Sequence, residues 1–179
     1  KIEDRGPVFF RQKRCTKNGK VFEILKFRSM IVDAEKGGET IPCRTGDPRI
    51  THVGRVIRKL RIDEFPQIIN VLKGDMSIVG PRPERVEHVE AYTKEIPEFS
   101  YRLRVKGGLT GYAQIYGKYN TSPYDKLRLD LQYIEKQSLL MDLKLILLTV
   151  KIMFVPESTE GFTQKRSEQI AEEAKTKEQ

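Results

Sequence analysis

The segment LRIDEFPQIINVLKGDMSIVGPRPE, residues 60–84, constrains the fold more than any other part of the chain. Proline has no backbone N–H and is accepted in a helix only in its first turn, so a helix that contains Pro66 must begin close to it. Asp63 is well suited to the N-cap position, and Gly74 to the position that closes the helix. The segment therefore predicts a helix that begins near Asp63 and ends before Gly74. Its expected buried side consists of Ile68, Ile69, Val71 and Leu72.

The N-terminal part of the chain contains a strong hairpin signal. Asn18-Gly19 is a dipeptide typical of tight β-turns, and β-forming side chains flank it at residues 8–10 and 21–27. A short helix is expected over residues 31–36. Residues 37–50 are rich in Gly, Pro and Thr, and this composition favours a loop.

The rest of the chain has mostly helical patterns. From Thr51 to Leu60, apolar residues recur at intervals of three and four, as on one face of a helix. A short strand is expected over residues 76–80, and a glycine-punctuated loop or strand over residues 106–120. Further helices are predicted over residues 84–95, Tyr124–Lys136 and Leu139–Val155.

These elements together indicate the fold class. A chain of 179 residues is within the usual size of a single domain. The pattern predicts an α/β (α+β) fold, rich in amphipathic helices, around a small β-hairpin or sheet. We expect the folded domain to occupy residues 1–160, and the polar residues 161–179 to form a tail.

The charge of the chain is unevenly distributed. Residues 1–62 carry 16 Lys and Arg against 7 Asp and Glu, whereas the remainder is nearly neutral. A basic half indicates an anionic partner such as phosphate, nucleic acid or acidic lipid, although a solvated basic face explains the charge alone equally simply. Nucleic acid is not expected, because aromatic residues are 8% of the chain, Trp is absent and no binding signature occurs.

Cysteine and histidine are too few to suggest a metal site of their own. Cys15 and Cys43 are far apart in the sequence and form no CxxC pair, so a zinc site is not expected. The same cysteine usage indicates a protein of a reducing compartment. His52 and His88 are the only histidines, so histidine-centred metal or acid–base chemistry is not expected either.

Residues 139–155 form the longest apolar stretch, but charged residues interrupt it. Asp142, Lys144 and Lys151 leave no run long enough to cross a membrane. On a helix the two lysines share one face and Asp142 lies nearly opposite. An interfacial helix with lysines at the lipid head groups and a core helix both fit this pattern.

Asp63 and Glu64 are the residues most able to carry chemistry. Next to a phosphate, a carboxylate can act as a nucleophile, or it can bind Mg²⁺, which prefers oxygen ligands. The positive end of the helix dipole would keep a carboxylate ionised and would favour phosphate. The alternative for both residues is structural: an N-cap followed by a first-turn glutamate.

Three cations could join this pair. Arg82 lies between Pro81 and Pro83, which restrict the backbone, and a rigid guanidinium suits two-pronged phosphate recognition, although a surface turn is equally compatible. Arg58 and Lys59 precede Asp63 by about one turn and could neutralise a pyrophosphate. For these two the alternative is a solvated basic helix face.

Several motifs in the order found here resemble one family. The segments KFRSM, residues 60–84, GLTGYAQIYGKYN and residues 124–154 are similar to the bacterial sugar transferases, the monotopic polyprenol-phosphate phosphoglycosyl transferases. The resemblance extends from about Gly6 to Phe154. The family's hydrophobic N-terminal segment, a re-entrant membrane helix in its minimal members, is expected to lie before Gly6 and is absent from this chain.

The resemblance implies an activity and roles for residues. Such enzymes transfer a phosphosugar from a UDP-sugar to a polyprenol phosphate, usually undecaprenyl phosphate, and release UMP. It implies that Asp63 is the nucleophile and that Glu64 binds Mg²⁺. Arg58 would contact phosphate, and Arg82 matches the arginine of the family's Pro-Arg-Pro motif.

The expected partners are therefore a UDP-sugar, polyprenol phosphate and the cytoplasmic face of the plasma membrane. The sequence leaves the sugar, the glycan pathway and the oligomeric state open, a homo-oligomer included. Two other functions remain compatible with the same residues: a non-catalytic module that binds nucleotide-sugar or lipid, and a UDP-sugar phosphohydrolase that uses water as the acceptor.

Overall fold

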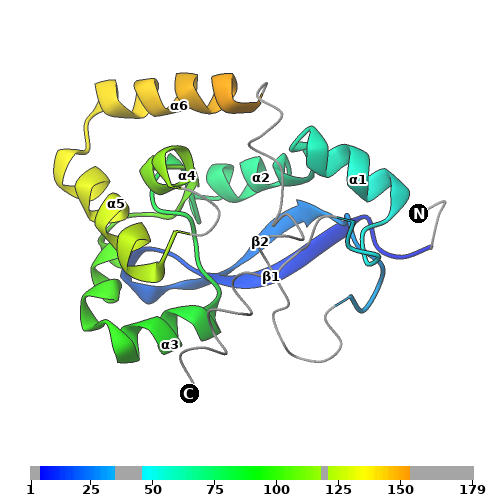
Figure 1. The fold of residues 1–179 in the computed structure, drawn as a ribbon, viewed down its shortest axis with the longest axis horizontal. Helices are drawn as coiled ribbons and strands as arrows, with labels where there is room; N and C mark the ends of the chain where they lie inside the picture. Colours follow the sequence, from blue (N-terminus) through cyan, green and yellow to red (C-terminus); the bar gives the residue numbers. More distant parts are fainter. Residues whose placement is uncertain (1–4, 35–45, 118–120, 154–179) are drawn as a thin grey trace, which may run out of the picture.

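The computed structural model describes residues 5–34, 46–117 and 121–153 (Figure 1). Within these residues there are six α-helices, three 3₁₀-helices and two sheets of two strands each. The predicted α/β, helix-rich class is therefore confirmed. The expected tail, residues 161–179, lies outside the described residues, and the division into domain and tail stays a prediction.

The predicted hairpin is present. Strands β1 (Phe9–Cys15) and β2 (Val21–Phe27) pair antiparallel in the register Phe9 with Phe27 through Cys15 with Val21. Asn18 and Gly19 form the turn, a short 3₁₀-helix η1 (Lys17–Gly19), with positive φ angles of 57° and 73°. Asn and Gly tolerate this left-handed backbone better than other residues, which is why the dipeptide marks the turn.

The short helix expected over residues 31–36 is not found in its described part. Residues 31–34 contain a turn, and residues 35 and 36 lie outside the described residues, as do 37–45 of the expected loop. Residues 46–50, the described end of that loop, contain no helix or strand apart from an isolated bridge between Met30 and Ile50.

Helix α1 (His52–Lys59) begins as predicted, because the Thr51 side chain accepts a hydrogen bond of 2.9 Å from Gly54 N–H. The next helix begins later than expected. Asp63 lies in a 3₁₀ turn, η2 (Ile62–Glu64), and α2 (Gln67–Leu72) follows. Arg61 has a left-handed backbone, with φ of 55°, which separates η2 from α1.

The buried side of α2 also differs from the prediction. Ile68, Ile69 and Leu72 are exposed, and of the predicted set only Val71 packs against a buried core, formed by Phe22, Ile24 and Met76. The helix instead turns Asn70 towards β2, where its side chain accepts from Leu25 N–H at 3.0 Å and donates to Glu23 O at 2.8 Å. Strand β2 offers backbone groups that need partners, and this amide supplies them.

A second, parallel sheet joins distant parts of the chain. Strand β3 (Ser77–Val79) pairs with β4 (Gly108–Thr110), so the predicted strand is confirmed and the loop or strand of residues 106–120 contains a strand. The same segment also forms a short helix that was not predicted, α4 (Tyr112–Tyr116). The remaining helical elements are α3 (Val86–Glu95), η3 (Pro97–Arg104), α5 (Pro123–Lys136) and α6 (Leu139–Met153).

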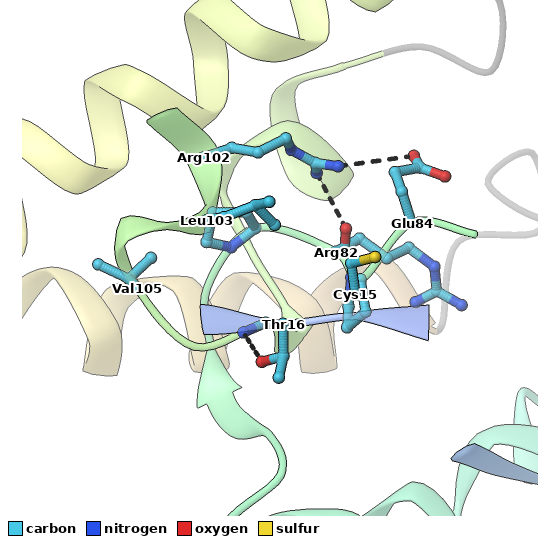
Figure 2. A pocket seen from close by; sticks show the side chains of 10 residues that line it. Cys15, Thr16, Arg82, Glu84, Arg102, Leu103 and Val105 are labelled. Atoms are coloured by element: carbon cyan, nitrogen blue, oxygen red, sulfur yellow. Dashed lines mark hydrogen bonds and ion pairs between the residues drawn. The ribbon is translucent and has the colours of Figure 1, made fainter. Parts of the chain in front are cut away.

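The hairpin and the parallel sheet are tied together by one side chain. Thr16, just after β1, donates to Asp75 O at 3.0 Å. It also accepts from Gly107 N–H at 3.0 Å, the dashed line drawn at Thr16 in Figure 2. Thr16 is buried, so both hydrogen bonds are sheltered from water. This places the residues just before β3 and just before β4 beside the hairpin.

Helix α6 is partly a core helix and partly an exposed one. Leu145 is buried with Val79 and Tyr133, and Thr149 hydrogen-bonds Thr110 at 2.6 Å. Asp142 accepts from Tyr133 OH at 2.8 Å on this inner side. In the described part of the chain, no helix is sufficiently long and apolar to cross a membrane.

Candidate active site

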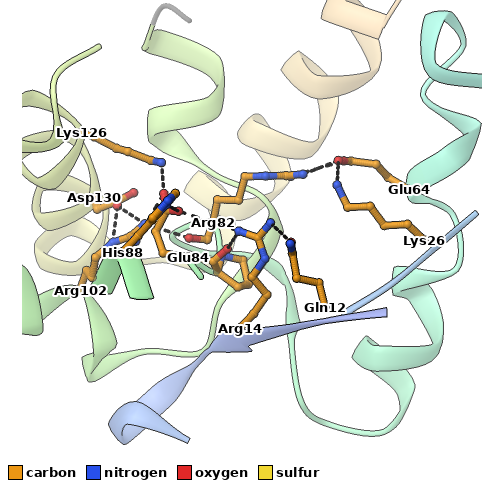
Figure 3. Close-up of polar contacts among 11 residues, drawn as sticks. Gln12, Arg14, Lys26, Glu64, Arg82, Glu84, His88, Arg102, Lys126 and Asp130 are labelled. Atoms are coloured by element: carbon orange, nitrogen blue, oxygen red, sulfur yellow. Dashed lines mark hydrogen bonds and ion pairs between the residues drawn. The ribbon is translucent and has the colours of Figure 1, made fainter. Parts of the chain in front are cut away.

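The site lies where three distant segments meet (Figure 3). Glu64 comes from η2, Lys26 from β2, and Arg82 from the loop after β3. Lys26 Nζ donates to Glu64 Oε1 at 3.0 Å. Arg82 donates to both carboxylate oxygens, through Nη1 to Oε2 at 3.4 Å and through Nη2 to Oε1 in a short hydrogen bond. Glu64 is thus held between two cations.

These cations set the ionisation of Glu64. Burial alone would raise the pKa of this carboxyl group, but Arg82 and Lys26 outweigh burial and hold the pKa well below its usual range. In return, Glu64 raises the pKa of Arg82, whereas burial lowers the pKa of Lys26. Glu64 is therefore an anion under all ordinary conditions.

Asp63 has the opposite environment although it is the next residue. Burial and then the charge of Glu64 raise its pKa, and Lys26 and Arg58 oppose this only in part. We expected a helix N-terminus to stabilise its charge. The helix begins at Gln67, four residues later, so its free N–H groups do not cap Asp63. Within the described residues Asp63 forms no ion pair.

The structure brings together most, but not all, of the residues predicted for the site. Arg82 pairs with Glu64, and Arg58 is near enough to act on the pKa of Asp63. Lys59 is exposed on α1 and makes no ion pair with any residue that the structure describes. The phosphate-binding roles of these residues stay predictions.

Sequence reasoning assigned no role to Lys26, although a signal for it was present. Side chains alternate along a strand, so Lys26 shares a face of β2 with Phe22 and Ile24, both of which are buried. A lysine in line with buried side chains needs an acidic partner, and Glu64 supplies it.

Gln67 was also missed. It is fully buried, one turn after Asp63, and neither its amide oxygen nor its amide nitrogen has a hydrogen-bond partner among the described residues. Its spacing from Asn70, three residues, gives α2 a buried polar stripe that helical periodicity could have indicated.

The carboxylates of the site fit the expected Mg²⁺ only as a small set of ligands. No group of three or more acidic, His or Cys side chains that could hold a metal occurs among the described residues. Mg²⁺ needs less than this, because it keeps waters and takes one or two carboxylates together with substrate phosphates. Glu64 fits: it is ionised, and its Oε2 receives only the 3.4 Å hydrogen bond from Arg82. Magnesium binding itself stays a prediction.

Comparison with known proteins identifies the family. The family model described as bacterial sugar transferase matches residues 1–156. The chain belongs to this family. The resemblance inferred from the motifs is thereby confirmed.

Three curated relatives illustrate the range of the family. A UDP-N-acetylgalactosamine-undecaprenyl-phosphate N-acetylgalactosaminephosphotransferase from Aeromonas hydrophila is 45% identical over 84% of this chain and 36% of its own length. The galactosyl transferase CpsE from Streptococcus agalactiae is 44% identical, over 86% of this chain and 36% of its own. A UDP-glucose:undecaprenyl-phosphate glucose-1-phosphate transferase from Caulobacter vibrioides is 42% identical, over 88% of this chain and 61% of its own.

The chain matches between about a third and three fifths of the length of these relatives. The three names agree on a transferred sugar unit but differ in the sugar, namely N-acetylgalactosamine, galactose or glucose. The relatives therefore support a class of reaction and leave the sugar open.

Proposed function

We propose that this sugar transferase domain moves a phosphosugar from a UDP-sugar to a polyprenol phosphate, such as undecaprenyl phosphate, through a covalent intermediate on Asp63. UMP is the first product, and a polyprenol-diphospho-sugar that begins a surface glycan is the second. The names of the relatives support the class of reaction. The geometry around Asp63 supports the route.

In the first step, a carboxylate oxygen of Asp63 attacks the phosphorus that carries the sugar. The bond from this phosphorus to the bridging oxygen breaks, and UMP leaves with the electron pair. In the second step, a phosphate oxygen of the polyprenol phosphate attacks the same phosphorus and releases the Asp63 carboxylate. No proton transfer to the protein is required in either step.

The observation that carries the proposal is the asymmetry between two neighbouring carboxylates. Glu64 is held by Lys26 and Arg82, so attack on phosphorus would cost it those contacts. Asp63 has no ion pair among the described residues, and its raised pKa makes it the more basic of the two. A carboxylate that is partly desolvated and only weakly neutralised is the better nucleophile.

The surrounding cations match the charge of the donor. Arg58 stands near Asp63 and would contact the diphosphate, and Arg82 holds Glu64 in place. When bound, Mg²⁺ would neutralise the phosphate oxygens, with Glu64 Oε2 as its protein ligand. Positioning and charge neutralisation are the main requirements of phosphoryl transfer.

The direct test is the mass of the intact protein after incubation with a UDP-sugar and Mg²⁺. We expect an added phosphosugar on the wild type and none on Asp63→Asn. Glu98→Gln, an exposed carboxylate on η3, is the matched control and should form the adduct normally. Wild-type UMP release by Asp63→Ala would contradict the proposal.

The same assay separates the two alternative functions. A binding module releases no UMP at all. A phosphohydrolase releases UMP at the same rate with and without polyprenol phosphate, whereas the transferase turns over repeatedly only when the lipid phosphate is present.

We also propose that this domain rests on the cytoplasmic face of the plasma membrane. Helices α1, α2 and α6 lie on the same side of the hairpin (Figure 1), and their outward apolar side chains are exposed, with Leu72 83%, Leu139 87% and Leu140 81% accessible. Lys144 and Lys151 lie among the apolar residues of α6, as expected for lipid head groups. A lipid surface is the partner that suits such a face because it takes both apolar and cationic groups.

Sedimentation with vesicles of phosphatidylglycerol and phosphatidylethanolamine tests this surface. Leu140→Glu combined with Leu143→Glu should reduce the bound fraction at least fivefold, since two charges would enter the apolar layer. Val21→Glu, equally apolar and half-exposed but on the hairpin, is the matched control. Equal binding by all three proteins would exclude α6 from the membrane contact.

A further inference from the structure

The loop from Pro81 to Glu84 is held by its carbonyl groups. Its two prolines have no N–H to donate, so carbonyl oxygens are the main backbone groups available for hydrogen bonds. All four successive carbonyls are used, and each partner comes from outside the loop. The four hydrogen bonds are Gly108 N to Pro81 O at 2.9 Å, Arg102 Nη2 to Arg82 O at 2.9 Å, Arg14 Nη1 to Pro83 O at 3.2 Å and Cys15 N to Glu84 O at 2.9 Å.

Arg102 is the more deeply buried of the two side-chain donors, with 2% of its side chain exposed against 16% for Arg14. Its Nε and Nη2 both contact Asp130 Oδ2, at 2.9 and 2.7 Å. Asp130 belongs to α5 and is buried as well. These two contacts to one carboxylate oxygen fix the guanidinium plane, and the same Nη2 also donates to the carbonyl of Arg82.

The side chain of Glu84 gathers further charges at the end of the loop (Figure 3). Lys126 donates a short hydrogen bond to Glu84 Oε1. Side-chain nitrogens of Arg14, His88 and Arg102 lie within 4.0 Å of the Glu84 carboxylate oxygens. We call this cluster the Glu84 network. It consists of Arg14, Glu84, His88, Arg102, Lys126 and Asp130.

Little space remains behind the loop. The cavity lined by Cys15, Arg82, Glu84 and Arg102 has a volume of about 10 Å³ (Figure 2). This is about the space that one water molecule needs, so the loop cannot move backwards without displacing packed groups. The side chain of Arg82 leaves the loop on the other side, towards Glu64 (Figure 3).

We propose that Arg102, fixed by Asp130, is a positioning residue that sets the direction of the Arg82 guanidinium. It acts through the Arg82 carbonyl and does not touch the donor. Arg82 in turn holds Glu64, so the network beneath the loop determines the geometry of the carboxylate beside the nucleophile. This inference deepens the proposed function and rests on it for its effect on rate.

A double-mutant cycle tests the proposal. Initial rates of UMP release, or of adduct formation in a single turnover, are measured for wild type, Arg102→Lys, Arg82→Ala and the double variant. Lysine keeps the charge but cannot hold Asp130 and the carbonyl with one planar group. We expect Arg102→Lys to lower kcat about tenfold in the wild type and less than twofold when Arg82 is already alanine. Equal losses in both backgrounds, or no loss in the wild type, would overturn the proposal.

Arg104→Lys is the matched control, because Arg104 lies on the same element, stacks over Tyr101 at 4.4 Å and is exposed. Its rate should stay within twofold of wild type. If Arg102→Lys fails to fold, the cycle is repeated with Asp130→Asn, which has nearly the same size, removes the charge and keeps one acceptor oxygen. A smaller loss of rate in the Arg82→Ala background than in the wild type again supports the proposal, and equal losses in the two backgrounds reject it.

A readout without catalysis separates this inference from the proposed function. The Nε–H signal of Arg82 in a nitrogen-15 spectrum, assigned by its loss in Arg82→Lys, should exchange slowly with water in the wild type. In Arg102→Lys the exchange should become at least tenfold faster, and in Arg104→Lys it should not change. An unchanged rate in Arg102→Lys overturns the positioning role even if the transferase activity is confirmed. Faster exchange in a protein that releases no UMP would retain it and reject only the proposed function.

Discussion

Two charged clusters lie on either side of the Pro81–Glu84 loop, and they use their carboxylates differently. Asp63 and Glu64 are half-buried, and only Glu64 is paired. In the Glu84 network, Glu84 and Asp130 are both buried and both paired. The first cluster leaves one carboxylate available for a ligand, whereas the second uses every charge to hold the loop.

Each cluster contains one carboxyl group with a lowered pKa and one with a raised pKa. Burial works to raise the pKa of Glu64 and Glu84, but their cations outweigh it. Burial prevails at Asp63 and also at Asp130, despite Arg102. The difference lies in access, because Asp63 faces partly towards solvent and Asp130 is 1% exposed. A raised pKa therefore marks a candidate nucleophile only where a substrate can reach it.

The largest effect is expected at Asp63. Asp63→Asn should lower UMP release by about a thousandfold or more, because the amide cannot form the phosphosugar ester. Its stability should not fall at neutral pH, since a carboxyl group with a raised pKa costs free energy when it is ionised in the folded state. Rates and thermal melts of the same preparation check both statements. A large loss of stability would mean that Asp63 has a structural role after all.

Asp130→Ala should lower the stability of the fold, in contrast to Asp63→Asn. Removing the side chain leaves the buried Arg102 guanidinium without the oxygen that accepts from its Nε and Nη2. This loss outweighs the raised pKa of Asp130 and costs about 3–5 kcal/mol of unfolding free energy. Urea titration measures this cost, with Asp63→Ala as the matched control, for which we expect less than about 1 kcal/mol. Equal costs for the two alanine variants would remove the distinction between an available and a fully paired carboxylate.

The Glu84 network should also determine part of the acid stability. The pKa of Glu84 is lowered from its usual 4.5 to about 2. A lowered pKa contributes stability that is complete above the unfolded value and is lost as pH falls from about 4.5 towards about 2. The contribution at neutral pH is about 3 kcal/mol. Unfolding free energies measured along this pH range should decline less steeply in Glu84→Gln, and an identical slope would contradict the assignment.

Local chemistry accounts for the parts of the fold that the sequence predicted. Asn18-Gly19 forms a turn because these residues tolerate positive φ, and Gly74 closes α2 for the same reason, with φ of 79°. Pro66 marked the start of a helix because it has no N–H to lose. In each case the property belongs to the residue itself, so no knowledge of its neighbours in space was needed.

Contacts between distant segments account for what the sequence did not predict. The inward face of α2 depends on Asn70 meeting β2, and apolar spacing within α2 pointed to the opposite face. In the site, motifs indicated Asp63, Glu64 and Arg82, but the pairing of Lys26 with Glu64 joins residues 38 positions apart. Lys59 was included by sequence proximity alone, and the fold leaves it on the surface.

The smallest expected effect is on stability, and it concerns the buried amide of Gln67 beside Asp63 and Glu64. In the Glu84 network each buried carboxylate has at least one ion-pair partner, whereas neither polar atom of the Gln67 amide, one turn from Asp63, has a hydrogen-bond partner among the described residues. A buried amide without partners costs stability, so Gln67→Met, which is similar in size and apolar, should raise the unfolding free energy by about 1 kcal/mol. Asn70→Leu, which removes an amide that is bonded to β2, is the matched control and should lower it. If Gln67→Met is instead destabilising, its amide is satisfied in solution, and both clusters are built to the same standard of pairing.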